Sequence, residues 1–424
     1  MPACPNLYDT ATPTVDIAVD GQRAAMASGS RALAAGDAAG AGTDQVYGAG
    51  RDDVVAVTAG MPDGITVWQS ADSVWMTPAV GDITGDGVPD LLIGAPGSDE
   101  GVGQVIVLAG PVTRLRTWDD NPITVKGADT TAFGSAPQVG DATGDGALDL
   151  LVTDGNASGA LVSLFAGPVD VDTDLGAAVA TWSEDSPDGA SSYGSAATGL
   201  LTDLDGDGID DVVLFDAASS SVPVRSGCDS DSPGAIGVFD GPAAGGSYWL
   251  GDADALLFGA VNRAFFGFSV TGGDVDGDGY GDLLVSGYGA NWHPELQLLV
   301  GPIRAGASPV AEFEVGVSGV VNSIGDLDGD GHADVIASAG DTAFDTGDPS
   351  GPEVDAWYGP FAGSYGVLPD GCTYAADARW VDSTGLSFGN AVLAADLTHS
   401  GRGTLAVGSS AADGTGVIDL WSGQ

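Results

Sequence analysis

The sequence predicts an all-β protein built from a repeated unit, and three observations support this fold class. A nine-residue acidic loop recurs five times along the chain with nearly the same residues. Each loop is followed by an apolar β-type segment and, after one further strand, by a Gly that in most units precedes Pro. The chain also holds 69 Gly among 424 residues, with many short Val, Ile and Leu runs and no long helical periodicity. This composition is typical of short strands joined by frequent turns.

The five acidic loops have the composition of cation sites. Three of them, 203–211, 274–282 and 326–334, place Asp at positions 1, 3, 5 and 9 and Gly at positions 4 and 6. Two relatives, 82–90 and 141–149, keep Asp at 1, 5 and 9 and have Thr at 3. Alternate residues of a tight loop point inward, so these side chains and the carbonyl of position 7 can supply the about six to eight oxygens that calcium prefers. The glycines supply the positive φ angles that the turn needs.

Two further segments look like eroded copies of this loop. Residues 37–45 (DAAGAGTDQ) and 396–404 (DLTHSGRGT) keep the first Asp, a Gly at position 6 and the following strand. Both lack carboxylates at positions 3, 5 and 9. We therefore expect a hairpin at both places and no tight calcium site.

The glycines that end the third strand of each unit count seven repeats. They are Gly60, Gly110, Gly167, Gly241, Gly301, Gly359 and Gly423. The resulting spacing of about 45 to 70 residues suits four short strands and their turns. In the clearest unit the strands read 266–274, 282–289, 296–302 and 310–316. The acidic loop is thus expected between the first and second strands of each unit.

Seven small sheets are most simply arranged in a ring. One such sheet cannot bury both faces alone, so neighbouring units must stack, and ring closure removes the exposed ends of the array. The sequence therefore predicts a seven-bladed β-propeller with four antiparallel strands per blade, formed as one domain by residues 13–424 after a tail at 1–12. Only two strands, 404–410 and 416–423, follow the last loop. We expect the unassigned strand at 13–21 to be the outermost strand of that last blade.

The charge balance excludes several classes of partner. With 60 acidic and 11 basic residues the formal net charge is −49, which argues against binding to nucleic acid or to anionic lipid. A high-salt habitat is an alternative source of this acidity and does not change the metal prediction. No run of 18 apolar residues is present, so no transmembrane helix is expected.

The three cysteines, Cys4, Cys228 and Cys372, are too few for a disulfide scaffold, and their pairing stays open. Cys4 follows Pro2 and Ala3, which is compatible with the remnant of a truncated lipoprotein start. A free cysteine in a tail is the simpler interpretation.

The order of these signals resembles the FG-GAP repeat. An aromatic-Gly pair, such as Phe266-Gly267, precedes the acidic loop, and a strand such as LLIGAP (91–96) or LLVSGYG (283–289) follows it. Further pairs occur at Phe133-Gly134, Tyr193-Gly194 and Phe388-Gly389. The resemblance covers nearly the whole of residues 13–424. Because these repeats form the propeller headpiece of integrin α subunits and occur in many secreted bacterial proteins, it implies an extracellular or cell-surface protein with structural calcium, about five ions in all.

Carried over position by position, the resemblance implies five ligand sets, in each of which the fourth residue acts through its carbonyl oxygen. The sets are Asp82, Thr84, Asp86, Val88 and Asp90; Asp141, Thr143, Asp145, Ala147 and Asp149; Asp203, Asp205, Asp207, Ile209 and Asp211; Asp274, Asp276, Asp278, Tyr280 and Asp282; and Asp326, Asp328, Asp330, His332 and Asp334.

Rival types of loop match this sequence less well. An EF-hand needs a bidentate Glu at position 12, where this chain has Leu214, Val285 and Ala337. The loops could also be Asp-Gly turns that hold hairpins without metal. Four carboxylates within nine residues repel one another unless something neutralises them, so calcium remains the favoured interpretation.

The sequence offers little support for catalysis. His293, His332 and His399 are the only histidines, and no nucleophile, zinc or phosphate-loop motif is present. We expect instead an adhesion or recognition module for a protein or glycan, working as a monomer or within a larger surface assembly. The alternatives are a non-catalytic carbohydrate-binding or lyase-associated domain of a secreted enzyme system, and a structural component of the cell surface.

The ligand is expected at the long connections that face away from the acidic loops. These connections are 219–234, 287–295 and 340–353, and they include Arg225 and Trp292. Trp and Arg are favoured anchors of interfaces. Most other tryptophans, such as Trp68, Trp357 and Trp421, fall on expected strands and are predicted to pack between blades.

Overall fold

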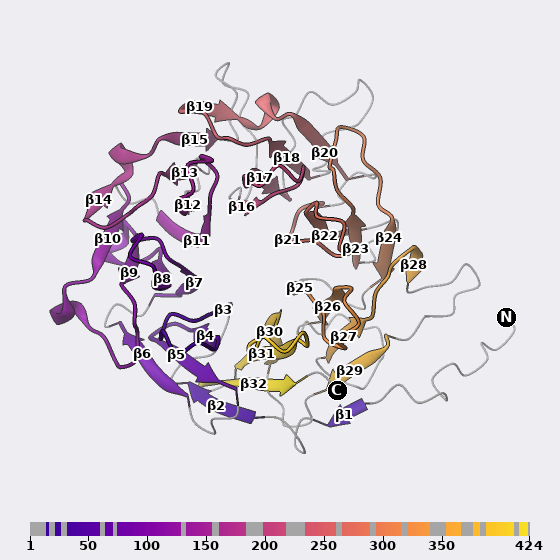
Figure 1. Cartoon of the computed structure of the whole chain (residues 1–424), viewed down its shortest axis with the longest axis horizontal. Helices are drawn as coiled ribbons and strands as arrows, with labels where there is room; N and C mark the ends of the chain where they lie inside the picture. The colour runs from indigo at the N-terminus through magenta and orange to yellow at the C-terminus, as the bar shows by residue number, and fades with distance from the viewer. Residues whose placement is uncertain are drawn as a thin grey trace, which may run out of the picture.

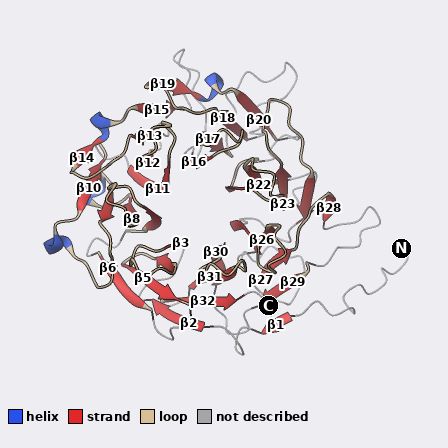
Figure 2. Cartoon of the chain, in the orientation of Figure 1, coloured by secondary structure: helices blue, strands red, loops and turns tan. Residues whose placement is uncertain are grey.

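Seven small sheets form a ring in the computed structural model of the chain (Figure 1). Nearly all of the regular structure is strand, and the few short 3-10 helices lie at the outer rim (Figure 2). This confirms the predicted seven-bladed β-propeller. The structure describes residues 14–16, 22–26, 32–59, 64–70, 74–128, 133–154, 161–183, 198–217, 234–259, 265–288, 294–314, 321–339, 353–365, 376–381, 387–410 and 415–422.

Each blade has four antiparallel strands, which follow one another from the centre of the ring outward. Blade 1 has β3 (Ala32–Gly36), β4 (Gln45–Ala49), β5 (Asp53–Thr58) and β6 (Ile65–Gln69); blade 2 has β7 (Thr77–Gly81), β8 (Asp90–Ala95), β9 (Gln104–Leu108) and β10 (Ile123–Lys126). Blade 3 has β11 (Phe133–Gly140), β12 (Asp149–Asp154), β13 (Leu161–Phe165) and β15 (Ala180–Ser183); blade 4 has β16 (Thr198–Thr202), β17 (Asp211–Asp216), β18 (Ala235–Phe239) and β20 (Ala255–Phe258).

The remaining blades follow the same order. Blade 5 has β21 (Val270–Gly273), β22 (Asp282–Tyr288), β23 (Pro294–Leu299) and β24 (Ala311–Glu314); blade 6 has β25 (Val321–Gly325), β26 (Asp334–Ala339), β27 (Glu353–Trp357) and β29 (Ala378–Val381). Blade 7 has β30 (Ser387–Ala395), β31 (Thr404–Ser410), β32 (Gly416–Ser422) and β2 (Gln22–Met26). The short helices are η2 (Asp99–Gly101), η3 (Trp118–Asp120), η4 (Leu175–Ala177) and η5 (Leu250–Asp252).

The hydrophobic core consists of seven clusters, one between each pair of neighbouring blades. Successive side chains of a strand point to opposite faces, so each second strand contributes to two clusters. In β8, Leu91 and Ile93 pack toward blade 1, whereas Leu92 packs toward blade 3. This explains why these strands read as continuous apolar runs. Trp68, Trp357 and Trp421 are buried in these clusters, as predicted.

The aromatic-Gly pairs pack the innermost strand of a blade closely against the neighbouring blade. Phe133 is fully buried in the cluster between blades 2 and 3. Gly134 beside it has a φ of 100°, and a Cβ placed there would overlap the carbonyl oxygen of Gln104 in blade 2. Only glycine fits this close approach and this backbone conformation. Phe266 and Phe388 are buried in the same manner, and Gly267 and Gly389 also have positive φ angles.

A short fifth strand covers the outer edge of several blades. β14 (Thr173–Asp174), β19 (Gly246–Trp249) and β28 (Gly363–Tyr365) each run parallel to the outermost strand of the preceding blade. All three come from the connection between the third and fourth strands of the next blade, and Arg116 forms a single parallel bridge of this kind with Trp68 in blade 1. The blades therefore overlap along the circumference, which protects edges that would otherwise attract other chains.

An N-terminal strand closes the ring, as predicted, but it is a different strand from the expected one. β2 pairs antiparallel with β32, from Gln22 opposite Leu420 to Met26 opposite Gly416. The expected segment, 13–21, instead supplies β1 (Thr14–Asp16), which runs parallel to β29 at the outer edge of blade 6. At the centre, β3 of blade 1 contacts β30 of blade 7, which completes the ring.

Removal of the closing strand is expected to destabilise the ring. Deletion of residues 1–26 removes the five residue pairs between β2 and β32, and at about 1 kcal/mol for each hydrogen bond this costs roughly 5 kcal/mol. It also leaves β32 as an unpaired edge, so the shortened protein should self-associate. Thermal melting and size-exclusion chromatography measure both effects. Deletion of residues 1–16 is the control, because it removes β1 but keeps β2, and both of its effects should be smaller; equal behaviour of the two deletions would show that β2 does not hold the ring closed.

Candidate functional site

The acidic loops all lie at one end of the blades, where the first strand turns into the second. The five loops that were predicted as cation sites join β7 to β8, β11 to β12, β16 to β17, β21 to β22 and β25 to β26. The two eroded loops join β3 to β4 and β30 to β31, so both predicted hairpins are confirmed. The ring thus places seven equivalent loops side by side.

The Asp at position 1 shapes the turn in all seven loops. Its Oδ2 accepts a hydrogen bond from the N–H of the Gly at position 6, over 2.6 to 3.0 Å. In the five acidic loops the glycines at positions 4 and 6 have φ angles between 72° and 93°. The eroded loops keep this one carboxylate, Asp37 or Asp396, because the backbone turn depends on it even where the other acidic side chains are lost.

The Asp at position 9 joins the second strand to the third. In blade 5, Asp282 is fully buried; its Oδ1 accepts from the N–H of Gly301 at 2.8 Å and its Oδ2 from the N–H of Val275 at 2.7 Å. Asp90, Asp149, Asp211 and Asp334 are also buried and accept the same bond from the Gly. The second donor is the N–H of position 2 for Asp211 and Asp334, and the N–H of position 3 for Asp90 and Asp149. The Gly that donates the first of these bonds is the one that precedes Pro, and these five Gly-Pro bonds are cis.

Burial changes the acidity of this carboxylate. Loss of hydration raises the pKa of Asp211, Asp282 and Asp334 to about 6, although the two backbone donors act in the opposite direction. Neighbouring loop carboxylates raise the pKa further. Burial also raises the pKa of Asp90 and Asp149. A carboxylate with these neighbours is costly to ionise unless a cation compensates its charge.

Three loops gather carboxylates into clusters that could hold a metal ion. Each cluster consists of the Asp residues at positions 1, 3 and 9, with one oxygen from each lying within 4.8 Å of the others. The clusters are Asp203, Asp205 and Asp211; Asp274, Asp276 and Asp282; and Asp326, Asp328 and Asp334. Within the described residues these are the three such groups. Their donor set consists of hard oxygen ligands, which suits calcium or magnesium better than softer metals.

The structure does not bring every predicted ligand into these clusters. The carboxylates at position 5 (Asp207, Asp278 and Asp330) lie outside them, and each accepts the N–H of position 7 at 2.8 or 2.9 Å. Asp86 and Asp145 make the same bond in the two loops that have Thr at position 3. Those two loops, with Thr84 and Thr143, have three Asp each and form no such cluster.

Five of the loops are hydrogen-bonded to the loop that precedes them in the ring. In blades 1, 4, 5, 6 and 7 the N–H of position 8 donates to a backbone carbonyl of the preceding loop, as from Gly281 to Asp203 at 2.7 Å. In blade 2 this position is Pro89, which has no N–H. At the closure, the N–H of Asp44 in blade 1 donates to Leu397 of blade 7 at 3.1 Å, and His399 Nε2 lies 3.6 Å from Asp44 Oδ1. These bonds link the backbones of adjacent loops.

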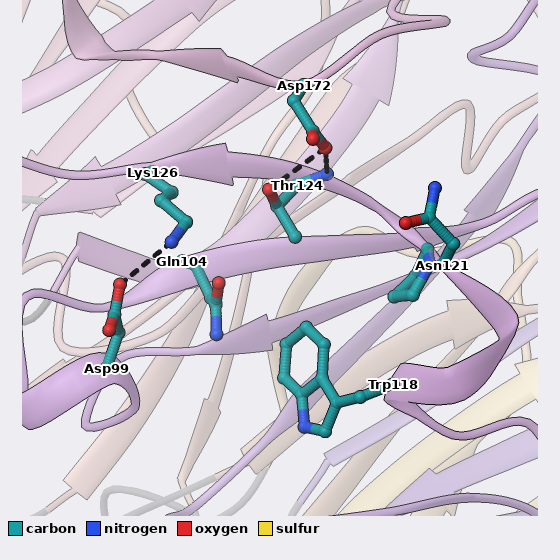
Figure 3. A pocket seen from close by; sticks show the side chains of 8 residues that line it. Asp99, Gln104, Trp118, Asn121, Thr124, Lys126 and Asp172 are labelled. Carbon is teal, nitrogen blue, oxygen red and sulfur yellow. Dashed lines mark hydrogen bonds and ion pairs between the residues drawn. The ribbon is translucent and has the colours of Figure 1, made fainter.

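A separate pocket of about 520 Å³ lies on the flank of blade 2 (Figure 3). It is lined by Asp99, Gln104, Trp118, Asn121, Pro122, Thr124, Lys126 and Asp172. Sequence reasoning missed this pocket because its residues come from separate segments of blades 2 and 3. The one local signal was the polar Gln104 at the start of an otherwise apolar strand.

Several residues singled out in the sequence lie outside the described part of the structure. These are Cys4, Cys228, Cys372, Tyr193, Gly60, Gly423, Arg225, Trp292 and His293, together with nearly all of the connections 219–234, 289–293 and 340–352. Of the other histidines, His332 lies in an acidic loop and His399 in an eroded loop, as expected. No helix in the described ranges has the length and hydropathy required to cross a bilayer.

Comparison with known proteins gives one family and several distant structures. The FG-GAP repeat family matches residues 74–108 and 266–295, which contain the acidic loops of blades 2 and 5. No curated protein sequence matches the chain.

Three solved structures are similar over most of the chain. The crystal structure of BBS1N in complex with ARL6DN has 10% identity and a TM-score of 0.47, covering 96% of this chain and 98% of that one. The WD40 domain of Toxoplasma gondii coronin has 11% identity and a TM-score of 0.49, covering 95% and 86%. The Dos1 propeller has 9% identity and a TM-score of 0.48, covering 95% and 83%.

Proposed function

Since this chain is a seven-bladed β-propeller that carries FG-GAP repeats, we propose that it is an exported recognition module whose loops bind structural calcium. The observation that carries this proposal is the triple recurrence of the aspartate cluster at the same place in the blade. Residues 13–424 act as one domain, and the ligand is a protein or a glycan.

Calcium is held by the loop oxygens of five blades. In blades 4, 5 and 6 the clustered carboxylates at positions 1, 3 and 9 supply three ligands, and position 5 and the carbonyl of position 7 complete the set. In blades 2 and 3 Thr84 and Thr143 take the place of the third Asp. When bound, the ion neutralises carboxylates that otherwise repel one another and cross-links the first and second strands of the blade.

The ion supports the fold rather than a reaction. The acidic loops of blades 4, 5 and 6 are bonded to the preceding loop through backbone groups, and each position-9 Asp is bonded to the end of the third strand. An ion bound in the loop therefore holds three strands of one blade, and two neighbouring blades, in fixed positions relative to one another. The rigid ring then presents its remaining surfaces for recognition, which is the common use of β-propellers that lack an active site.

Export follows from the expected affinity. Calcium sites of extracellular modules have dissociation constants of about 10⁻⁴ to 10⁻³ M, so they fill in extracellular fluid and stay empty in cytosol. FG-GAP repeats are typical of extracellular proteins. A carbohydrate-binding domain of a secreted enzyme system is the second candidate, and it is favoured by the half-exposed Trp118 in the flank pocket of blade 2.

A binding panel tests the recognition function. Fluorescently labelled protein is applied to immobilised matrix proteins and to a glycan array, first in millimolar calcium and then in excess chelator. We expect reproducible binding to at least one class of surface in calcium, loss of that binding in chelator, and recovery when calcium is restored. Absence of binding to both classes would refute the recognition function, and binding that persists in chelator would refute the role of calcium in it.

A further inference from the structure

We propose that the flank pocket of blade 2 binds one ring of a neutral saccharide, an inference that rests on the proposed recognition function and specifies its ligand class. The pocket lies on the side of the blade, so it is separate from the acidic loops. Its volume of about 520 Å³ falls within the range of about 300 to 1,000 Å³ that is usual for small-molecule sites.

Gln104 is the strongest indication that the pocket takes a ligand. The residue is only 3% exposed, and its side chain lines the pocket. Figure 3 shows it in the middle of the pocket, between the Lys126–Asp99 pair and the ring of Trp118. An amide that lines a pocket is suited to bind a polar ligand through both its N–H and its C=O groups.

Trp118 supplies an aromatic wall that is held in place. It is 44% exposed, and its ring packs edge-on against the fully buried Trp68 at a centroid distance of 5.2 Å. The turn that carries it is fixed by Thr117, whose N–H donates to Asp120 Oδ2 at 2.9 Å. An exposed and immobile indole is suited to cover the apolar face of a ring, because little side-chain entropy is lost on binding.

The charged side chains of the pocket already have partners within the protein. Lys126 Nζ donates to Asp99 Oδ2 at 2.9 Å, which leaves the lining without an uncommitted cation for a carboxylate or phosphate. Asp172 Oδ1 accepts from the backbone N–H of Thr124 at 2.9 Å and from its hydroxyl at 3.1 Å, so Oδ2 stays available to accept from a hydroxyl. With a net charge of −49 on the chain, acidic ligands are further disfavoured.

The polar and aromatic groups of the lining match a sugar better than a peptide. Beside Gln104, Asn121 and Trp118 also line the pocket, so amide donors and acceptors lie near an aromatic face. A peptide would bind most simply by extending the sheet at β10. That edge is occupied, since Val125 and Lys126 already pair with Thr173 and Asp174 of β14. A hydroxyl-rich ring with one apolar face fits the remaining space and chemistry.

The test uses the full chain in millimolar calcium and a glycan array that holds neutral and acidic saccharides. Binding to each positive saccharide is then measured in solution for the wild type and for Trp118→Ala, Gln104→Leu and Trp75→Ala. Trp75 is the matched control, because it is 40% exposed and lies outside the pocket. We expect neutral saccharides to bind, with affinity at least tenfold lower in the first two variants and within twofold of wild type in the control.

The outcomes separate this inference from the function on which it rests. If saccharides bind equally well to the Trp118 and Gln104 variants, or if only acidic saccharides bind, the inference fails and the recognition function stands. Binding to matrix proteins without binding to any saccharide would likewise refute the inference and leave the recognition function in place. Absence of binding to both classes refutes both proposals. Thermal melting of each variant shows whether it is folded. Because Trp118 and Gln104 contribute different groups to the pocket, the test can still be made with one variant if the other misfolds.

Discussion

In excess chelator, the thermal unfolding midpoint of this protein is expected to fall by roughly 8 °C. An ion present at ten times its dissociation constant stabilises the folded state by about 1.4 kcal/mol, so five ions contribute about 7 kcal/mol. Dividing this free energy by the usual unfolding entropy of a chain of 424 residues gives the stated decrease in the unfolding midpoint. Differential scanning calorimetry with calcium, with chelator and with calcium restored measures it.

The same experiment includes its own controls. Magnesium at equal concentration should restore less of the midpoint, because it demands near-ideal octahedral geometry and keeps its water. Equilibrium dialysis should count about five calcium ions. A midpoint that chelator leaves unchanged would contradict the structural role of calcium, and fewer than three bound ions would contradict the clusters at Asp203, Asp274 and Asp326.

Substitution of Asp282 by Ala is expected to cost about 3 to 6 kcal/mol of unfolding free energy in calcium. The change leaves the buried N–H groups of Val275 and Gly301 without their acceptor, at about 1 to 3 kcal/mol each, and removes a calcium ligand. Asp278→Ala, at an exposed position in the same loop, removes one bond to Tyr280 and the proposed ligand at position 5, but it leaves no buried N–H group without an acceptor, so it should cost only about 1 to 2 kcal/mol. Urea unfolding at constant calcium measures both.

In chelator the cost of Asp282→Ala should be smaller at neutral pH and should grow as the pH falls. The pKa of Asp282 is about 6 in the folded protein, against an ordinary value of 3.8, so ionisation at pH 7 costs the wild type about 3 kcal/mol. The variant is spared this cost. As the pH falls from 7 toward 4 the folded wild type takes up the proton and regains that stability, whereas the variant does not. An unchanged difference between pH 7 and pH 5 would show that burial of this carboxylate has little energetic effect.

Local and repeated features of this fold could be predicted from the sequence. The turn at each acidic loop depends on one Asp and two Gly residues within nine positions, and its recurrence indicated the number of blades. The pairing of Phe133 with Gly134 likewise reflects a local steric need, which is why such pairs mark the innermost strands.

Features that depend on backbone pairing alone could not be predicted. The segment 13–21 alternates apolar and polar residues more clearly than β2 does, yet β2 closes the ring, so side-chain alternation did not identify the closing strand. The fifth strands are two to four residues long and have no composition of their own. In the candidate metal loops, the sequence identified positions 1, 3 and 9 as neighbours, but the carboxylate at position 5 bonds within its own turn.

The antiparallel pairing of β2 with β32 has a mechanical consequence. Gln22, where the chain enters β2, lies opposite Leu420, close to where the chain leaves β32, and β1 lies on the same side of the ring as these two strands (Figure 1). Tension applied to the two ends would therefore separate these strands one pair at a time, as a zipper opens, instead of shearing all pairs together. A protein of this design resists force well when it is tethered at one end and poorly when it is stretched between two anchors.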